Sequence, residues 1–270
     1  MPDAVKQITT HELLKMKERH ERIVMLTCYD ALFARLLDPS VEILLVGDSV
    51  NQVLGGQDTT LSATLEQMIY HTRIVRRGAA HALVICDLPF LTYQVSIEDS
   101  IRNAGRVMKE TGCHGVKLEG GRAMAPTMRA LVDIGIPVMG HLGLTPQSVH
   151  ALGGYRVQGR DEQTAQRLKD DALALQDAGA FAVVLELVPT PVSAEISKSL
   201  TVPTIGIGAG PSCDGQVLVL HDMLGLNDRF SAKFVKKYAT LADDVRKAAE
   251  SFAAEVRSGR YPDADHSFAK

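Results

Sequence analysis

The sequence predicts an α/β fold, a single-domain (β/α)8 TIM barrel that spans residues 1–270. Eight short apolar runs alternate with stretches of helical periodicity, which is the pattern of a parallel sheet covered by helices. The runs are almost continuously apolar, so the sheet is expected to be buried on both faces. No Pro- or Ser-rich stretch is typical of a domain linker. An open doubly wound sheet is the alternative. It would usually show a G-x-G-x-x-G motif after the first strand, but that strand runs into Thr27-Cys28-Tyr29-Asp30 without one.

The strands follow one another at regular intervals along the chain. They are expected at residues 23–29, 43–48, 82–87, 115–119, 137–141, 181–187, 202–208 and 216–222. Ahead of them, Thr9 and Thr10 introduce a helix over residues 11–20, which we expect to close the bottom of the barrel.

Helices are expected between most of the strands, and their ends carry recognisable signals. Thr64 with Gln67 forms a capping box, and Ser96 with Asp99 starts the next helix in the same way. The expected helices cover residues 31–37, 65–77, 97–111, 125–134 and 161–178, and Gly78, Gly112, Gly135 and Gly179 end four of them. The pattern of residues 233–260 predicts a C-terminal extension of one or two amphipathic helices. We expect this extension to wrap the barrel, and it could also carry an oligomer contact.

The composition is that of an ordinary globular protein, with 23% charged and 46% apolar residues. A formal net charge of −3 argues against a general nucleic-acid binder. No apolar run approaches the ~20 residues of a membrane span, and the N-terminus lacks the apolar stretch of a signal peptide. The four scattered cysteines indicate buried thiols in a reducing cytoplasm rather than a disulfide or a zinc site.

Three neighbouring strands end at a carboxylate, namely Asp48, Asp87 and Glu119. Burying such a group unpaired costs roughly 3 kcal/mol or more, so we expect these side chains to meet at one hydrated end of the barrel. Adjacent strands lie about 4.8 Å apart, which allows the three to converge. Oxygen-only ligation favours Mg²⁺, and a dication would relieve their mutual repulsion. Each acid taken alone also fits an N-cap or a surface position.

Three further strand residues are candidates for chemistry. Lys117 lies two residues before Glu119 and shares its side of the strand, so it is expected to bind a substrate carboxylate, to polarise a carbonyl or to pair with an acid. Glu186 stands in an apolar setting that favours a proton acceptor, and we prefer this role to a salt bridge with Arg156. His141 is the rival base, to which we assign a binding or supporting role.

Three loop features are less specific. Ser49 follows Asp48, and its hydroxyl and N–H suit an anionic oxygen as well as a simple turn. The glycines of residues 206–210 suit a phosphate cradle or merely tight packing. Residues 141–162 form the longest irregular stretch, which is typical of a lid or a binding loop.

A set of strings in a fixed order covers residues 9–239. They are VGDS, GGQDTTL, CDLPF, VKLEGG, GHLGLTPQS with GGYRVQGR, LELVP, IGIGAG, and LVLHDMLGL with KFVKKYA. Together they resemble the ketopantoate hydroxymethyltransferase family. The resemblance implies a barrel that binds Mg²⁺ and assembles as a homodecamer. It also implies transfer of a hydroxymethyl group from 5,10-methylenetetrahydrofolate to 3-methyl-2-oxobutanoate, giving 2-dehydropantoate for pantothenate and coenzyme A synthesis.

The resemblance also implies roles for individual residues. The metal ligands are Asp48, Asp87 and Glu119. The oxoacid contacts are Asp48, Ser49, Asp87 and Lys117, with His141 near the pocket, and Glu186 is the catalytic base. One departure is visible, because Val50-Asn51-Gln52 stands where a Leu-Gly-Met-like stretch is expected. This departure affects the shape of that loop and leaves the metal chemistry untouched.

Two other functions fit parts of the pattern. An Mg²⁺-dependent enzyme of the phosphoenolpyruvate mutase and isocitrate lyase type needs similar carboxylates, but the lyases expect a KKCGH-like cysteine loop that is absent from this sequence. A non-catalytic barrel that binds oxoacids would not need Glu186 opposite the metal.

Overall fold

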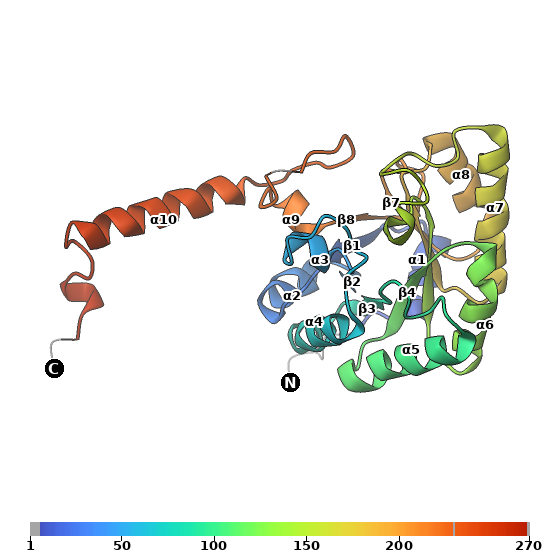
Figure 1. The fold of residues 1–270 in the computed structure, drawn as a ribbon, viewed down its shortest axis with the longest axis horizontal. Helices are drawn as coiled ribbons and strands as arrows, with labels where there is room; N and C mark the ends of the chain where they lie inside the picture. The colour runs from blue at the N-terminus through green and yellow to red at the C-terminus, as the bar shows by residue number, and fades with distance from the viewer. Residues whose placement is uncertain (1–5, 229, 269–270) are drawn as a thin grey trace. The chain divides into compact units, whose positions relative to one another are not determined.

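The computed structural model describes residues 6–228 and 230–268. Its centre is a closed barrel of eight parallel strands in the order of the sequence (Figure 1). The first and last strands pair in register from Ile23 with Gly215 to Leu26 with Leu218, which closes the sheet. The strands are β1 (Ile23–Thr27), β2 (Ile43–Val46), β3 (Leu83–Asp87), β4 (Gly115–Glu119), β5 (Val138–Gly143), β6 (Ala182–Glu186), β7 (Thr204–Ile207) and β8 (Gly215–Leu218). The (β/α)8 barrel is therefore confirmed, and the open sheet is excluded.

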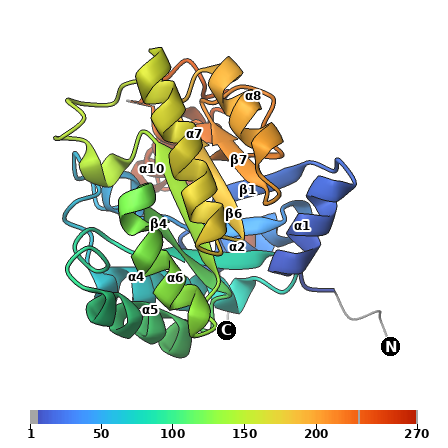
Figure 2. The same ribbon diagram turned by 90° about the vertical axis from the view of Figure 1, so that its right-hand side faces the viewer.

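Helices cover the outside of the barrel, and α7 and α8 lie side by side over its later strands (Figure 2). The helices between the strands are α2 (Ala31–Leu37), α3 (Val50–Val53), α4 (Leu65–Gly78), α5 (Ile97–Thr111), α6 (Ala125–Asp133), α7 (Glu162–Asp177) and α8 (Thr190–Ser199). The sequence analysis did not predict α3 or α8. Helix α8 has a proline in its first turn, a start signal that was available in the sequence.

The predicted helix signals are confirmed with one exception. Thr64 and Gln67 form the full capping box of α4, and Gly112 ends α5 with φ +67°. Gly78, by contrast, is the last residue of α4 itself. A Cβ atom at Gly78 would lie 2.5 Å from the carbonyl oxygen of Ala31. The glycine therefore allows α4 to approach α2 closely, and it does not provide the left-handed helix end that we expected.

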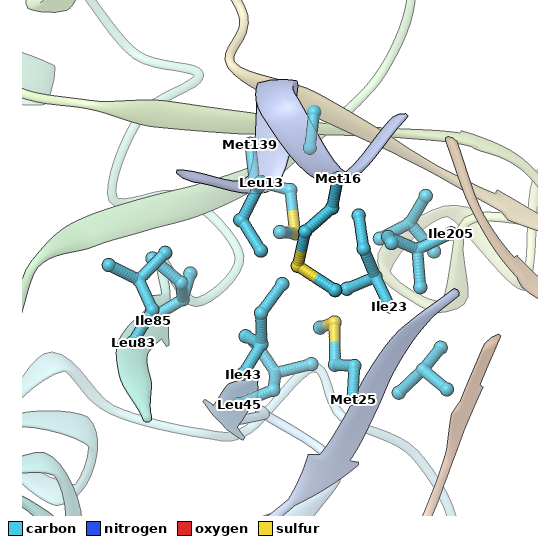
Figure 3. Packing of buried hydrophobic residues seen from close by; sticks show 13 residues of the cluster. Leu13, Met16, Ile23, Met25, Ile43, Leu45, Leu83, Ile85, Met139 and Ile205 are labelled. Carbon is cyan, nitrogen blue, oxygen red and sulfur yellow. The ribbon is translucent and has the colours of Figure 1, made fainter. Parts of the chain in front are cut away.

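Helix α1 (Thr10–Glu18) closes the amino-terminal end of the barrel, as predicted. Thr9 caps it by accepting a hydrogen bond from the Glu12 amide. Leu13 and Met16 are buried among side chains from inside the barrel, several of them at or near the start of a strand (Figure 3). That cluster comprises Leu13, Met16, Ile23, Met25, Ile43, Leu45, Leu83, Ile85, Met139, Ala182, Val184, Ile205 and Val217. This end of the barrel is therefore apolar and filled.

The chain divides after Val219 into two compact units. The second unit contains α9 (Leu220–Met223), α10 (Leu241–Arg257) and a short 3₁₀ helix, η4 (Ala264–His266). The expected C-terminal helical extension corresponds to α10, which begins later than predicted because residues 233–240 form turns and coil. Its attachment to the barrel, and a single domain over residues 1–270, stay predictions. No helix in the described part of the chain has the length and apolarity needed to cross a membrane.

We predict that Leu13→Ala destabilises the barrel because it leaves a cavity in the plugged end. The free energy of unfolding should fall by about 2–5 kcal/mol in urea denaturation followed by circular dichroism. Lys15→Ala on the exposed face of the same helix is the control and should change it by less than about 0.5 kcal/mol. An equal loss of unfolding free energy in the two variants would contradict the role of α1 in closing this end of the barrel.

Candidate functional site

The polar strand ends meet at the carboxyl-terminal end of the barrel, where β3, β4, β5 and β6 lie side by side. Strand pairing places Asp87 beside Lys117 and Glu119 beside His141. Glu186 of β6 continues the row, because it pairs with Gly143 of β5. The structure therefore brings together the charged residues predicted from the sequence, and their contacts follow.

The carboxylates of Asp48, Asp87 and Glu119 form one side of the site, and all three are buried. The Asp48 amide donates a hydrogen bond of 3.1 Å to Asp87 Oδ2. Burial, and then the charges of Asp87 and Glu119, raise the pKa of Asp48 to about 8. Burial also raises the pKa of Asp87, although Lys117 opposes this rise. The crowding of negative charge that we predicted is thus present.

Lys117 supplies the nearest compensating charge. Its ammonium lies 2.8 Å from Asp87 Oδ1 and 4.0 Å from Glu119 Oε1. Burial opposes ionisation of Lys117, but the charges of Asp87 and Glu119 outweigh it and hold the pKa of the ammonium above its ordinary value. The expected salt bridge is therefore present. One ammonium faces three carboxylates here, so Lys117 alone does not balance their charge.

His141 lies between Glu119 and Glu186. Its Nδ1 is 3.3 Å from Glu119 Oε1, and its Nε2 is 3.2 Å from Glu186 Oε2. The second contact is within ion-pair distance but does not satisfy hydrogen-bond geometry. Burial and the charge of Lys117 lower the pKa of His141, but the close contacts with the acids Glu119 and Glu186 outweigh them and raise it to about 9. The two rival bases are thus direct neighbours, and the Lys117 ammonium also lies 3.1 Å from His141 Nδ1.

Glu186 is the most accessible acid of this row. Its side chain is 16% exposed, against 3–4% for those of Asp87 and Glu119. Both Glu186 and Arg156 lie in the described part of the chain, and no ion pair joins them there. The salt bridge that we considered as an alternative for Glu186 is therefore formed with His141 instead.

Ser49 opens the short helix α3 directly after Asp48. Its hydroxyl is 2.8 Å from the hydroxyl of the buried Tyr29, so a neighbour from the end of β1 orients it. This contact leaves the predicted role of Ser49 in binding an oxoacid untested. The alternative, a simple turn residue, also fits its position.

Two residues of the site were missed in the sequence analysis, Gln147 and Tyr93. Gln147 donates from its backbone to Glu119 Oε2 and from its side chain to Asp48 Oδ2, both at 2.9 Å. The Tyr93 hydroxyl donates to Gln147 Oε1 at 2.6 Å. Both residues are buried. A glutamine in a polar loop and a tyrosine after a proline-containing turn carry no signal that separates them from ordinary loop residues.

The long loop after β5 differs in part from the expected lid. Strand β5 continues to Gly143, and a 3₁₀ helix, η3 (Pro146–Ser148), follows it. The start of the loop is therefore ordered and attached to the site through Gln147. Farther along, Gln52 of α3 donates a hydrogen bond of 3.1 Å to the exposed Tyr155 hydroxyl, which links the two loops.

The glycine-rich segment after β7 fits the tight-packing interpretation. A Cβ atom at Gly210 would lie 2.4 Å from Thr190 Oγ1, and Gly210 has φ +82°. Gly210 therefore allows the segment after β7 to approach α8, and Gly206 packs against Cys213 and Gln216, which accounts for both without a phosphate.

The donor set suits a hard dication, although the side chains do not form a finished cage. Among the described residues, no group of three or more His, Cys, Asp or Glu side chains is placed to hold a metal ion by itself. The acids nevertheless offer oxygen atoms only, and the single positive charge of Lys117 does not balance the three carboxylates. Mg²⁺ commonly takes one or two carboxylates and completes its shell with water and substrate. The residues therefore fit such an ion.

Solved structures with the same fold include several enzymes that act on small acids. A phosphonopyruvate hydrolase in complex with oxalate and Mg²⁺ has a TM-score of 0.63 at 11% identity, covering 96% of this chain and 93% of that one. A 2,3-dimethylmalate lyase has a TM-score of 0.60 at 19% identity, covering 96% and 92%. At these identities the likeness establishes the barrel fold alone.

Sequence comparison is more specific. Residues 7–264 match the family model described as ketopantoate hydroxymethyltransferase. The 3-methyl-2-oxobutanoate hydroxymethyltransferase of Pelobacter propionicus is 54% identical over 99% of this chain and 100% of its own length. The enzyme of the same name from Syntrophus aciditrophicus is 53% identical over 97% of each chain. This chain is therefore an enzyme, a hydroxymethyltransferase, and it belongs to the ketopantoate hydroxymethyltransferase family.

Proposed function

We propose that this enzyme transfers a hydroxymethyl group from 5,10-methylenetetrahydrofolate to 3-methyl-2-oxobutanoate and forms 2-dehydropantoate for pantothenate and coenzyme A synthesis. The observation that carries the proposal is the arrangement of the site. Asp48, Asp87, Lys117 and Glu119 form one wall, and the more accessible Glu186 follows beyond His141. An oxoacid needs both parts, a charged group to hold its carboxylate and keto oxygens and a base for the neighbouring carbon.

The oxoacid is bound by the wall in this proposal. Lys117 faces its anionic carboxylate with a charged ammonium, and Ser49 offers a hydroxyl and a backbone N–H. Asp48 and Asp87 reach the same ligand through the cation that they hold. His141 borders the pocket, and its contact with Glu119 lowers the pKa of that carboxyl against the opposing effect of burial.

We assign the cation to Mg²⁺, held by Asp48, Asp87 and Glu119 directly or through water. When bound, the ion supplies a Lewis acid that draws electron density from the keto oxygen of the substrate. Its positive charge also offsets the burial and the neighbouring carboxylates that together raise the pKa of Asp48. Support comes from the oxygen-only donor set and the unbalanced charge at the wall.

Glu186 acts as the base. Its carboxylate accepts the proton from C3 of the substrate, and the C–H electron pair moves into an enolate. The enolate carbon then forms a bond to the methylene carbon carried by the folate, while the two bonds of that carbon to the folate nitrogens break and those nitrogens take up the C3 proton and one proton of water. Over the whole reaction one water supplies the hydroxyl oxygen, and tetrahydrofolate is released. A correctly placed base accounts for roughly 10²–10⁴-fold in rate.

The cellular setting is also part of the proposal. We propose a cytoplasmic homodecamer whose partners are the oxoacid and the folate, without nucleic acid or membrane. The four cysteines are all buried free thiols, which fits a reducing compartment. The net charge of −3 fits small-molecule rather than nucleic-acid substrates.

We predict that the enzyme with Mg²⁺ and 3-methyl-2-oxobutanoate exchanges the C3 proton in D₂O, and that Glu186→Gln slows this exchange by about 10²–10⁴-fold. NMR measures the exchange, and calorimetry tests that the variant still binds the oxoacid. Glu195→Gln, the same substitution at an exposed position in helix α8, is the control and should retain the wild-type rate of proton exchange.

Exchange that persists in the Glu186 variant would assign the base to another group. Absence of exchange in the wild type, even with tetrahydrofolate bound, would contradict the enolate mechanism. Turnover with 5,10-methylenetetrahydrofolate then separates a transferase from a lyase or mutase.

We predict that EDTA abolishes turnover and that added Mg²⁺ restores it, because the wall then regains its cation. The thermal unfolding temperature, measured in parallel, should show that the chelated protein is still folded. Full activity in EDTA would remove the metal assignment from Asp48, Asp87 and Glu119.

We predict that the metal-free protein loses thermal stability as the pH rises from about 6.5 to 9. Asp48 and His141 have folded-state pKa values of about 8 and about 9, both above their ordinary values. Groups with raised values stabilise the fold below their unfolded pKa, and that contribution is lost as the pH rises through the folded pKa.

Scanning fluorimetry across this pH range measures the effect. Mg²⁺ should reduce the loss, since it replaces the protons held by the wall, and Asp48→Asn should flatten it. A metal-free unfolding temperature that rises over the same interval would contradict the charge crowding.

A further inference from the structure

Gln147 is buried at the carboxyl-terminal end of the barrel, where it contacts the two carboxylates that flank Asp87. It lies in η3, directly after β5. Its backbone N–H donates a hydrogen bond to Glu119 Oε2, and its side-chain amide donates one to Asp48 Oδ2. One residue from the loop after β5 thus reaches acids that follow β2 and end β4. Neither contact is required to build the barrel sheet.

The side-chain amide of Gln147 has a single allowed orientation. Its Nε2 faces two acceptors at 2.9 Å, Asp48 Oδ2 and the carbonyl oxygen of Leu88. Its Oε1 faces two donors, the Tyr93 hydroxyl at 2.6 Å and the Gln94 amide at 3.2 Å. A flipped amide would set oxygen against oxygen and nitrogen against nitrogen, so the network fixes the donor toward Asp48.

This fixed donor decides which oxygen of Asp48 is left open. Lys117 forms an ion pair with Asp87 Oδ1, and the Asp48 amide donates a hydrogen bond to Asp87 Oδ2. Both oxygens of Glu119 also have partners. Within the described residues, Asp48 Oδ1 is the one oxygen of these three carboxylates without a donor or ion-pair partner.

We propose that Gln147 is a positioning residue that holds Asp48 by Oδ2 and presents Oδ1 to the bound divalent cation. The inference rests on the proposed function, because it assumes that the wall takes Mg²⁺. Partners that orient a metal ligand typically contribute 10–100-fold to affinity. Gln147 would make this contribution without touching the substrate or the reacting atoms.

The test is calorimetric titration of the full-length protein with MgCl₂, with and without 3-methyl-2-oxobutanoate. Gln147→Met keeps the length of the side chain and removes the donor, so the Mg²⁺ dissociation constant should rise about 10–100-fold. Gln158→Met makes the same substitution in the same loop, where the side-chain amide donates to the Arg156 carbonyl, and should leave the constant unchanged.

Two further measurements separate positioning from a general structural role. Saturating Mg²⁺ should restore the C3 exchange rate of Gln147→Met, because Glu186 is untouched, whereas a damaged site would stay slow. Gln147→Asn keeps the polar group but is one methylene too short to reach Asp48, so it should weaken Mg²⁺ binding as well. The Asn variant decides the question if the Met variant does not fold.

The outcomes are distinct. Wild-type Mg²⁺ affinity in a folded Gln147 variant, or exchange that excess Mg²⁺ does not restore, overturns the role of Gln147 and leaves the proposed function standing. A wild-type protein that binds no Mg²⁺ under either condition overturns the metal assignment of the proposed function, and the inference with it.

Discussion

The excess of buried negative charge at the carboxyl-terminal end of the barrel is the constraint on which the rest of the site depends. Asp48, Asp87 and Glu119 are held together with one ammonium, that of Lys117, and one imidazole, that of His141. Carboxylates removed from water repel each other strongly, because little solvent screens them. Burial, and then the charges of Asp87 and Glu119, raise the pKa of Asp48 accordingly. A site in this condition favours a dication or a proton.

The barrel makes such a site possible by separating its two ends. At the amino-terminal end, Leu13 and Met16 of α1 fill the interior with apolar contacts. Burial of this kind supplies the stability that the charged end does not. Glycines such as Gly78 and Gly210 let helices approach their neighbours closely. The apolar end holds the strands in register, and the register sets the spacing of the acids at the other end.

The contacts within the site also change the meaning of individual residues. Glu186 and His141 are competing candidates for the base when only the sequence is considered. In the structure they are adjacent, and the contacts of His141 with Glu119 and Glu186 raise its pKa and favour its protonated form. A protonated imidazole does not accept a proton. This electrostatic setting supports the proposed assignment of the base to Glu186.

The sequence by itself determined the barrel, because the apolar period, the helix caps at Thr64 and Ser96 and the polar ends of the strands are local properties of the chain. It also indicated which acids meet, since parallel strands bring their carboxyl ends to one edge. It did not indicate Gln147 or Tyr93, whose importance lies in hydrogen bonds to residues far away in the sequence. It misassigned Gly78, because a close approach between α2 and α4 leaves no mark in either segment alone. Such pairings exist only once the chain has folded, so tertiary structure decided them.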